Sequence, residues 1–410
     1  MLPLLLLTVL PTQANDARPV SWEALPSLTA EVWQTGPGAA PRLEAEGWDA
    51  AARRPQRGPS AIWAEVQRGL PEQDQLTVAL DVPLRFGVAE TRAGERRAEA
   101  TRARACADQT AWAASVRVTW LEGWAARENS LHLAEYIDEL GTWLAPLEAA
   151  AGDGLVASLD VADLKVEQAR VFAEKAASDE AAAAADARLS TLLGQAVQVD
   201  PEDEALHTAR PTGTNPWAAL LQQMPPQPAV AAARADAAAT EAERRQAWAE
   251  ALPTASIGGM TVQGPDGTTP LLFAGMTLPL RTDGAARRAE LRARTAAATA
   301  DARWLHARER ARAEAEALRW DAALHRMQAL DQQLIEPLRA RQRQTLAAVQ
   351  AGLAPTSRLV LARRDLHEAE HEQIRVLVSL LASEARAAAR LAAPDAPGAS
   401  RCLSDASSSP

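Results

Sequence analysis

Two histidines one helical turn apart form the most recognisable chemical pattern in this sequence. Residues 367–371 read His-Glu-Ala-Glu-His, which fits the H-E-x-x-H pattern of zinc metallopeptidases and also its reversed H-x-x-E-H form. Residues i and i+4 share one face of a helix, so His367 and His371 could bind the same Zn²⁺. Metal-assisted hydrolysis is therefore the first chemical hypothesis.

A zinc peptidase needs more than this pair, because the metal requires a third protein ligand and the substrate requires a cleft. The remaining histidines stand in no third-ligand motif: His132, His207, His306 and His325. Helices rich in glutamate and histidine produce the five-letter match by chance. We therefore expect a solvated helix face, with no catalytic residue, no metal and no cofactor. In that helix, an apolar stripe that includes Leu366 and Ile374 should seat it against its neighbours.

The composition argues against several classes of protein. The chain has 410 residues, a formal net charge of −10 and a pI of about 5.3. This acidic balance, without a basic stripe, excludes nucleic acid as an expected partner. Hydrophobic residues make up 47%, many of them alanine, and aromatic residues only 4%, which favours long helices over a thick globular core. Cys106 and Cys402 lack C-x-x-C spacing, so they form no zinc ribbon or redox motif.

The beginning of the chain has features of an export signal. "MLPLLLLTVLPTQAND" is a short apolar run followed by small residues, and Thr12 and Ala14 can occupy the small positions before a cleavage site. No later run reaches the roughly 18 apolar residues of a transmembrane helix. A membrane crossing would therefore have to use strands.

Long stretches with little glycine or proline predict unusually long helices. Residues 88–150 and 285–350 cover roughly 65 positions each, or about 100 Å at a rise of about 1.5 Å per residue. Ordinary globular helices have about 8 to 20 residues, so these belong to a coiled coil or another extended helical assembly. Shorter helices are expected near 40–57 and at 159–193, 226–251 and 356–392.

Two windows alternate with the period of a strand. They are "QLTVALDVPLRF" (75–86) and "LLFAGMTLPLR" (271–281). Each follows another strand candidate, at 60–69 or 254–264, across a loop rich in turn residues. The sequence therefore predicts two hairpins with strands of about ten residues, the length of a tilted membrane-spanning strand.

The chain also repeats itself. "VPLRFGVAETRAGERRAEATRARA" (82–105) corresponds to "LPLRTDGAARRAELRARTAAA" (278–298) at a shift of 196 residues, which also aligns Trp124 with Trp320. Further on, "DGLVASLDVADLKVEQAR" (153–170) corresponds to "AGLAPTSRLVLARRDLHEAE" (351–370). Hairpin, long helix, Gly-Leu turn and returning helix recur in the same order, which indicates a duplicated unit.

This duplicated order resembles the TolC-type outer membrane efflux protein family, especially the shorter members that serve metal and drug pumps. The stretch 227–259 reads like the family's helix-into-strand segment, and 351–372 like its tip and returning helix. The resemblance implies a mainly α fold with a small β part, made of duplicated strand-strand-helix-helix units in a long coiled-coil α-barrel. Four strands are too few to close a barrel, since about eight is the usual minimum. The resemblance implies a homotrimer whose strands form a 12-stranded transmembrane β-barrel in outer membrane lipid.

The expected organisation has six parts. They are a signal peptide (1–14), an N-terminal segment and helix (15–57), repeat 1 (58–196), an equatorial linker (197–224), repeat 2 (225–392) and a disordered tail (393–410).

The resemblance also assigns site residues. The Gly-Leu turns would be periplasmic tips that contact the helical hairpin of a periplasmic adaptor, at Gly154, Leu155, Gly352 and Leu353. Charges after the tips could lock a closed aperture, with ordinary surface residues as the open alternative: Asp160, Asp163, Arg358 and Arg363. The strand alternation places these residues toward lipid: Leu80, Val82, Leu84, Met276, Leu278 and Leu280.

The expected function is a passive exit duct of a tripartite efflux system. It would carry metal ions, drugs or other small molecules from the periplasm to the exterior, with an adaptor and an inner-membrane pump as partners. A soluble periplasmic coiled-coil scaffold or adaptor stays open as the alternative, although it explains the helices and leaves the strands unexplained. A zinc metallopeptidase explains only residues 367–371.

Overall fold

The computed structural model describes residues 17–53, 61–68, 74–84, 88–153, 158–200, 206, 213–223, 227–249, 254–264, 267–277 and 284–391. The chain divides into two compact units. The first lies within 1–37, 109–225 and 310–392, and the second within 38–108, 226–309 and 393–410. The predicted signal peptide, the predicted tail and Cys402 lie outside the described residues. The boundaries of the two sequence repeats stay a prediction.

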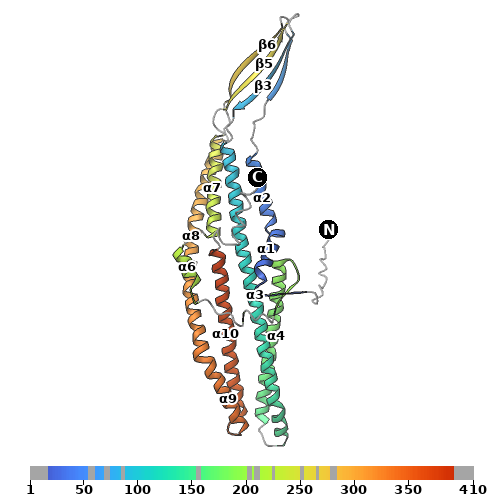
Figure 1. Ribbon diagram of the computed structural model, residues 1–410, viewed down its shortest axis with the longest axis vertical. Coiled ribbons are helices and arrows are strands. Elements are labelled where there is room, and N and C mark those ends of the chain that lie inside the picture. Colours follow the sequence, from blue (N-terminus) through green and yellow to red (C-terminus); the bar gives the residue numbers. More distant parts are fainter. Residues whose placement is uncertain are drawn as a thin grey trace. The chain divides into compact units, whose positions relative to one another are not determined.

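Four strands of the second unit form one antiparallel sheet. They are β2 (Ala61–Arg68), β3 (Asp74–Leu84), β5 (Thr254–Gly264) and β6 (Gly267–Thr277), in the order β2-β3-β5-β6 (Figure 1). Both predicted hairpins are present, and pairing of β3 with β5 joins them. β6 begins at Gly267, four residues before the predicted start, because its pairing with β5 continues to the turn, where Gly264 lies opposite Gly267.

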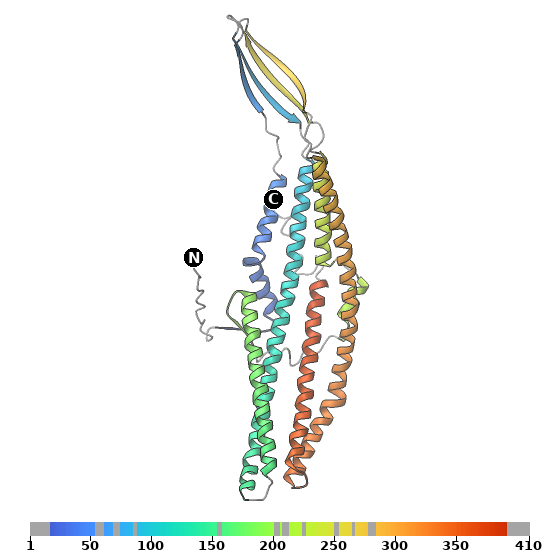
Figure 2. The same ribbon diagram turned by 180° about the vertical axis from the view of Figure 1, so that it is seen from behind.

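The first long helix pair follows the prediction closely. α3 (Val88–Gly152) has 65 residues, and α4 (Ser158–Leu193) returns along it. Figures 1 and 2 both show α4 beside the part of α3 that belongs to the first unit. α4 ends before Gly194, whose φ of 65° places it in the left-handed region that commonly terminates a helix.

The second long helix is interrupted next to Pro337, the proline that breaks the predicted helical stretch 285–350. It consists of α8 (Gly284–Ala329), a π-helical turn η2 (Leu330–Ile335) and α9 (Glu336–Gln350), and α10 (Thr356–Leu391) returns. Pro337 explains the interruption, because proline has no backbone N–H and its ring clashes with the carbonyl four residues earlier. A widened turn before Pro337 accommodates both effects.

Short elements complete the first unit, and the sequence did not predict them. They are β1 (Arg18–Val20), α1 (Leu25–Thr35), β4 (Val197–Val199) and α6 (Pro216–Gln223), with β1 and β4 paired in parallel. Three-residue strands carry too few positions for a readable alternation. Their place depends on long-range contacts, such as the hydrogen bond of 2.7 Å from Trp120 Nε1 to the Val20 carbonyl.

The core of the first unit is built around tryptophans. Trp124 and Trp320, which the repeat aligns, are each 2% exposed and belong to one buried cluster. Gly123 permits the close packing beside them: a Cβ there would lie 2.9 Å from Val199 Cγ2 and 3.1 Å from Ala185 Cβ. Helix α3 can therefore approach α4 and β4 at this level only through glycine.

Ion pairs join the helices of the second unit. These helices are α2 (Ala39–Arg53), α7 (Pro228–Ala249) and the parts of α3 and α8 within 88–108 and 284–309. Arg104 pairs with Asp236 at 2.6 Å, and Arg102 pairs with Asp49. α2 and α7 are the helices predicted near 40–57 and at 226–251.

Candidate functional site

Of the two predicted tips, the structure describes one, the turn between α9 and α10. Gly352 has a φ of 68°, a conformation that side chains rarely adopt. The Leu353 amide donates to the Ala348 carbonyl at 2.8 Å, and the Gly352 amide donates to the Val349 carbonyl at 3.0 Å. These two bonds form a Schellman motif that ends α9.

Leu353 is the unusual residue of this turn. In many Schellman motifs, the residue in its position packs an apolar side chain on the preceding helix. Here the side chain is 84% exposed, and the residue at the corresponding helix position is Ala348. The turn thus presents a leucine to its surroundings. Gly154 and Leu155, the other predicted tip residues, lie outside the described residues.

Arg363 lies inside the first unit, two turns from the tip. Its side chain is only 6% exposed, and its Nε lies 2.7 Å from Glu139 Oε2 on α3. Its Nη1 lies 3.5 Å from Glu370 Oε2 on α10, and its guanidinium carbon lies 5.1 Å from the centroid of the Tyr136 ring. Arg339 on α9 contacts Glu370 at 3.1 Å. The Arg363 guanidinium therefore connects α10 to α3, and the Arg339–Glu370 pair connects α9 to α10.

A second group of polar side chains extends this network to α4. The Tyr136 hydroxyl donates to Glu167 Oε1 at 3.1 Å, and Arg170 Nη2 lies 2.5 Å from the same oxygen. Burial and the negative charge of Glu167 raise the pKa of Tyr136, so its hydroxyl stays protonated and donates. Burial is the largest single influence and opposes ionisation of Glu167, but the hydrogen bonds from Arg170 and Tyr136 and the charge of Arg170 together outweigh it and lower the pKa of Glu167.

The four predicted aperture charges lie in different environments. Arg363 pairs with Glu139 and Glu370, and neither Asp160 nor Asp163 forms an ion pair with another described residue. The side chain of Arg358 is exposed. The sequence could not identify Glu139, because it lies far from Arg363 along the chain and inside an unbroken helix.

His367 of the His-Glu-Ala-Glu-His segment is buried and His371 is half-buried, so the expectation of a solvated face was wrong for His367. His367 is 5% exposed, and its ring centroid lies 5.9 Å from that of Tyr136 and 6.4 Å from that of His371. Leu366 and Ile374 are also buried, as predicted. α10 is thus covered over a broad face, which includes position 367 beside the leucine stripe.

Burial keeps these imidazoles neutral. Burial, reinforced by the nearby charge of Arg363, lowers the pKa of His367 to about 4. Burial also lowers the pKa of His371. Both rings line a cavity of about 550 Å³ between α3, α4 and α10, and neither Nδ1 has a hydrogen-bond partner among the described atoms.

A zinc centre requires a third ligand near the two histidines. Across the described ranges, no three histidine, cysteine, aspartate or glutamate side chains are grouped so that they could hold a metal ion. His132 faces the same region, but its Nε2 lies 3.3 Å from Glu128, and this hydrogen bond raises the pKa of His132. The pair His367 and His371 lacks the geometry that a metallopeptidase needs.

The strand register places those predicted lipid-facing residues that are described, Leu80, Val82, Leu84 and Met276, on a single face of the sheet. Leu80 pairs with Gly259 and Gly259 with Leu272, so these positions share a face; Leu84, Ala255 and Met276 share it in the same way. Val82 also lies on this face, since strand residues alternate by two. On β6, the Leu272 side chain is 90% exposed. Leu278 and Leu280 lie outside the described residues.

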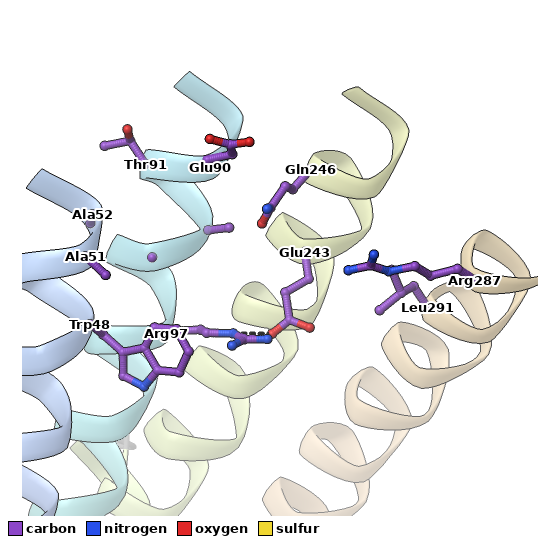
Figure 3. Close-up of a pocket in the computed structure, with 12 residues that line it drawn as sticks. Trp48, Ala51, Ala52, Glu90, Thr91, Arg97, Glu243, Gln246, Arg287 and Leu291 are labelled. Atoms are coloured by element: carbon purple, nitrogen blue, oxygen red, sulfur yellow. Dashed lines mark hydrogen bonds and ion pairs between the residues drawn. The ribbon is translucent and has the colours of Figure 1, made fainter. Parts of the chain in front are cut away.

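The second unit contains a cavity of about 270 Å³ that is lined by α2, α3, α7 and α8. Figure 3 shows Arg97 between Trp48 and Glu243, with the guanidinium carbon 4.5 Å from the Trp48 ring centroid and Nε 2.6 Å from Glu243 Oε1. Arg97 therefore joins three helices, and its charge is matched by a carboxylate.

These elements define a fold. Two strand hairpins paired in one sheet, each continued by long helices that turn and return, are the fold of TolC-type outer membrane channels. No described helix combines the length and apolar character that a bilayer crossing requires. No protein-family model matches the sequence, and no curated protein matches it significantly.

Particular solved structures match over nearly the whole chain. The outer membrane protein VceC of Vibrio cholerae has a TM-score of 0.70 at 17% identity, covering 90% of this chain and 96% of VceC. The CmeC outer membrane channel of Campylobacter jejuni has a TM-score of 0.67 at 12% identity, covering 94% of this chain and 89% of CmeC. A membrane protein from Pseudomonas aeruginosa has a TM-score of 0.70 at 18% identity, covering 93% and 97%. The fold predicted from the sequence is confirmed.

Proposed function

We propose that this chain is the outer membrane channel of a tripartite efflux system, which conducts metal ions, drugs or other small molecules from the periplasm to the exterior without chemical change. The observation that carries the proposal is the shared fold over at least 90% of the chain with the outer membrane protein VceC and the outer membrane channel CmeC. The channel would act with a periplasmic adaptor and an inner-membrane pump.

The sheet supports assembly of three copies. β2 and β6 are its outer strands, and each has an edge that is unpaired within the described chain. Lipid cannot satisfy the hydrogen bonds of such edges, so a sheet in a membrane must pair them with other chains. Three copies supply twelve strands, enough for a closed barrel. The face that carries Leu80, Val82 and Leu84 would contact lipid.

Exposed apolar residues on the helices support the same assembly. On α4, Leu159 is 68% exposed and Val166 is 71% exposed, and these residues lie one heptad apart on one face. On α8, Trp304 and Leu318 lie two heptads apart and are 61% and 73% exposed. In a coiled-coil α-barrel, neighbouring copies of the chain would cover these exposed apolar residues of α4 and α8.

The tip would be the docking point for the adaptor. Leu353 projects from a turn that the Schellman motif fixes, so a helical hairpin of the adaptor could pack on it without first ordering the turn. Gly154 and Leu155 would supply the equivalent contact in the first repeat. Within each copy, Arg363 would hold α10 against α3, and separation of the two helices would widen the passage.

Membrane fractionation tests the proposal most directly. The full chain should enter the outer membrane fraction, require detergent for extraction and migrate as a trimer that heating dissociates. A soluble periplasmic protein would overturn the channel and support the scaffold alternative.

Variants of the tip test adaptor docking separately. Leu353→Asp combined with Leu155→Asp should abolish resistance to exported compounds while the trimer still assembles. Leu353→Met retains an apolar side chain and should preserve resistance. If cells with the double aspartate variant are as resistant as cells with Leu353→Met, the docking role of the tip is contradicted.

A further inference from the structure

Four arginines and a tryptophan line a cavity of about 240 Å³ between α7 and α8. We refer to these residues as the arginine cluster: Arg244, Arg245, Trp248, Arg288 and Arg292. Arg244 and Trp248 are four residues apart on α7, and Arg288 and Arg292 are four residues apart on α8, so each pair shares a helix face. All five residues belong to the second unit.

The positive charge of this cluster is only partly compensated. Arg244 and Arg245 share one carboxylate, that of Glu241, at 2.7 Å and 3.0 Å. Arg288 and Arg292 form no ion pair with any residue in the described ranges, and the buried Nε of Arg244 has no hydrogen-bond partner there. Like charges four residues apart destabilise a helix, and an anion in the cavity would remove that repulsion.

The neighbouring face of α7 shows the contrast. In Figure 3, Glu243 pairs with Arg97 at 2.6 Å. The neighbouring residue, Arg244, points instead to a cavity in which arginines outnumber the described carboxylates. The two faces of one helix thus differ in chemistry: one carries a closed ion pair between helices, and the other carries two guanidinium groups that share a single carboxylate.

Phosphate is the anion that this arrangement suits. A guanidinium presents planar paired donors that match two phosphate oxygens, and several such groups around one cavity can bind a phosphate from different sides. Trp248 is 60% exposed beside them, and exposed tryptophans favour the boundary between lipid and water. A site with basic and aromatic side chains together suits a lipid headgroup better than a free ion.

The cluster lies close in sequence to the strands. α7 ends at Ala249 and β5 begins at Thr254, while β6 ends at Thr277 and α8 begins at Gly284. If the strands cross the membrane, the first residues of α8 and the last of α7 adjoin its surface. A phosphate at that level belongs to a lipid headgroup.

We propose that the arginine cluster binds the phosphate of an anionic lipid headgroup at the periplasmic surface of the outer membrane. The membrane setting rests on the proposed channel function, whereas phosphate binding rests on the cavity itself. Bound lipid would hold the ends of α7 and α8 together at the start of the barrel.

Lipid binding to the purified, full-length protein in a non-ionic detergent tests this site. Native mass spectrometry would count bound phosphatidylglycerol and phosphatidylcholine, and a parallel titration would use inorganic phosphate. Near a membrane surface each arginine contributes about 1 kcal/mol, or about five-fold in affinity, so Arg288→Gln with Arg292→Gln should weaken phosphatidylglycerol binding roughly 30-fold. Arg310→Gln, on the same helix but paired with Glu314 at 3.0 Å, serves as the matched control and should bind as the wild type does.

The outcomes distinguish failure of the lipid site from failure of the proposed channel function. Selective phosphatidylglycerol binding that the double variant loses, and that rising salt weakens, supports the lipid site. Equal binding of both lipids, unchanged binding by the double variant, or inorganic phosphate binding as tightly as phosphatidylglycerol overturns it. If the protein is absent from the outer membrane but the purified chain still binds phosphatidylglycerol selectively, the phosphate site stands and the channel function fails.

Discussion

Replacement of Arg363 by methionine should loosen the contact between α10 and α3. The variant loses the contacts of 2.7 Å to Glu139 and 3.5 Å to Glu370, together with the position over the Tyr136 ring. Removing one partner of a fully buried ion pair costs about 3–5 kcal/mol. Glu139 is 39% exposed and can be hydrated, and Glu370 keeps Arg339 at 3.1 Å. We therefore expect the opening free energy of this region to fall by about 2–3 kcal/mol.

Hydrogen exchange of the full-length protein measures this change directly. A decrease of about 2–3 kcal/mol corresponds to roughly 30- to 140-fold faster exchange of the α10 amides near residue 363. The neighbouring Arg364 provides the control: it is 43% exposed and pairs with Glu368, which is 60% exposed, at 3.0 Å. Such surface pairs contribute about 0.5 kcal/mol or less, so Arg364→Met should change exchange by no more than about two-fold.

Comparing the two variants tests whether the buried ion pair of Arg363 holds α10 against α3. If Arg363→Met and Arg364→Met exchange at equal rates, the buried ion pair adds nothing to the contact, and its role in holding α10 is refuted. Exchange in α3 around Trp120, which belongs to the apolar core, should remain unchanged in both variants. Faster exchange there as well would show general unfolding and would equally contradict a local role.

Three further changes test the packing and protonation of the first unit. Gly123→Ala should destabilise the protein by about 1–3 kcal/mol in denaturant titrations, because the added Cβ would lie 2.9 Å from a methyl carbon of Val199. Gly141→Ala is the control: a Cβ there would meet no neighbouring side chain within 4 Å, so this change should be neutral or stabilise the protein by about 0.5–1 kcal/mol. The folded-state pKa of His367, about 4, lies below the ordinary 6.5, so the unfolded chain binds more protons in this window. Stability should therefore fall by about 2 kcal/mol as the pH decreases from 7 to 4.5, and His367→Phe should flatten that part of the pH profile. Ser383→Ala leaves the Trp217 indole N–H, now bonded at 2.8 Å, buried without a partner, and should lower the free energy of unfolding by about 1–3 kcal/mol.

The sequence predicted the elements whose signal is local and long. The sequence predicted four helices and both hairpins to within a few residues; the helices are α3, α4, α7 and α10. Long helical stretches and strict strand alternation can be recognised from neighbouring residues alone. The β1–β4 pair was missed, since two three-residue strands far apart in sequence become strands only through mutual pairing. The π-helical turn before Pro337 was missed for a related reason: proline predicts a break but not the form that it takes.

The candidate site was predicted less well than the fold. The exposure of Leu353 follows from a local Gly-Leu turn and could be anticipated. The partner of Arg363 could not, because Glu139 is one of many glutamates on a helix whose rotation only tertiary packing fixes. The same limit explains His367: its neighbours Glu368 and Glu370 suggest a solvated face, but the helix turns this one position toward Tyr136.

The chemistry of the contact between α10 and α3 also determines how the two helices could separate. Around Trp120 the first unit is held by apolar side chains, and separation there would expose hydrophobic surface to water. At Arg363 the contact is made by a guanidinium, carboxylates and a tyrosine, which water can solvate again once they part. Contacts of this kind fix one arrangement of the helices, yet their loss is partly offset by hydration. Opening should therefore begin beside the tip at the polar contact, while the apolar core around Trp120 keeps the rest of the unit folded.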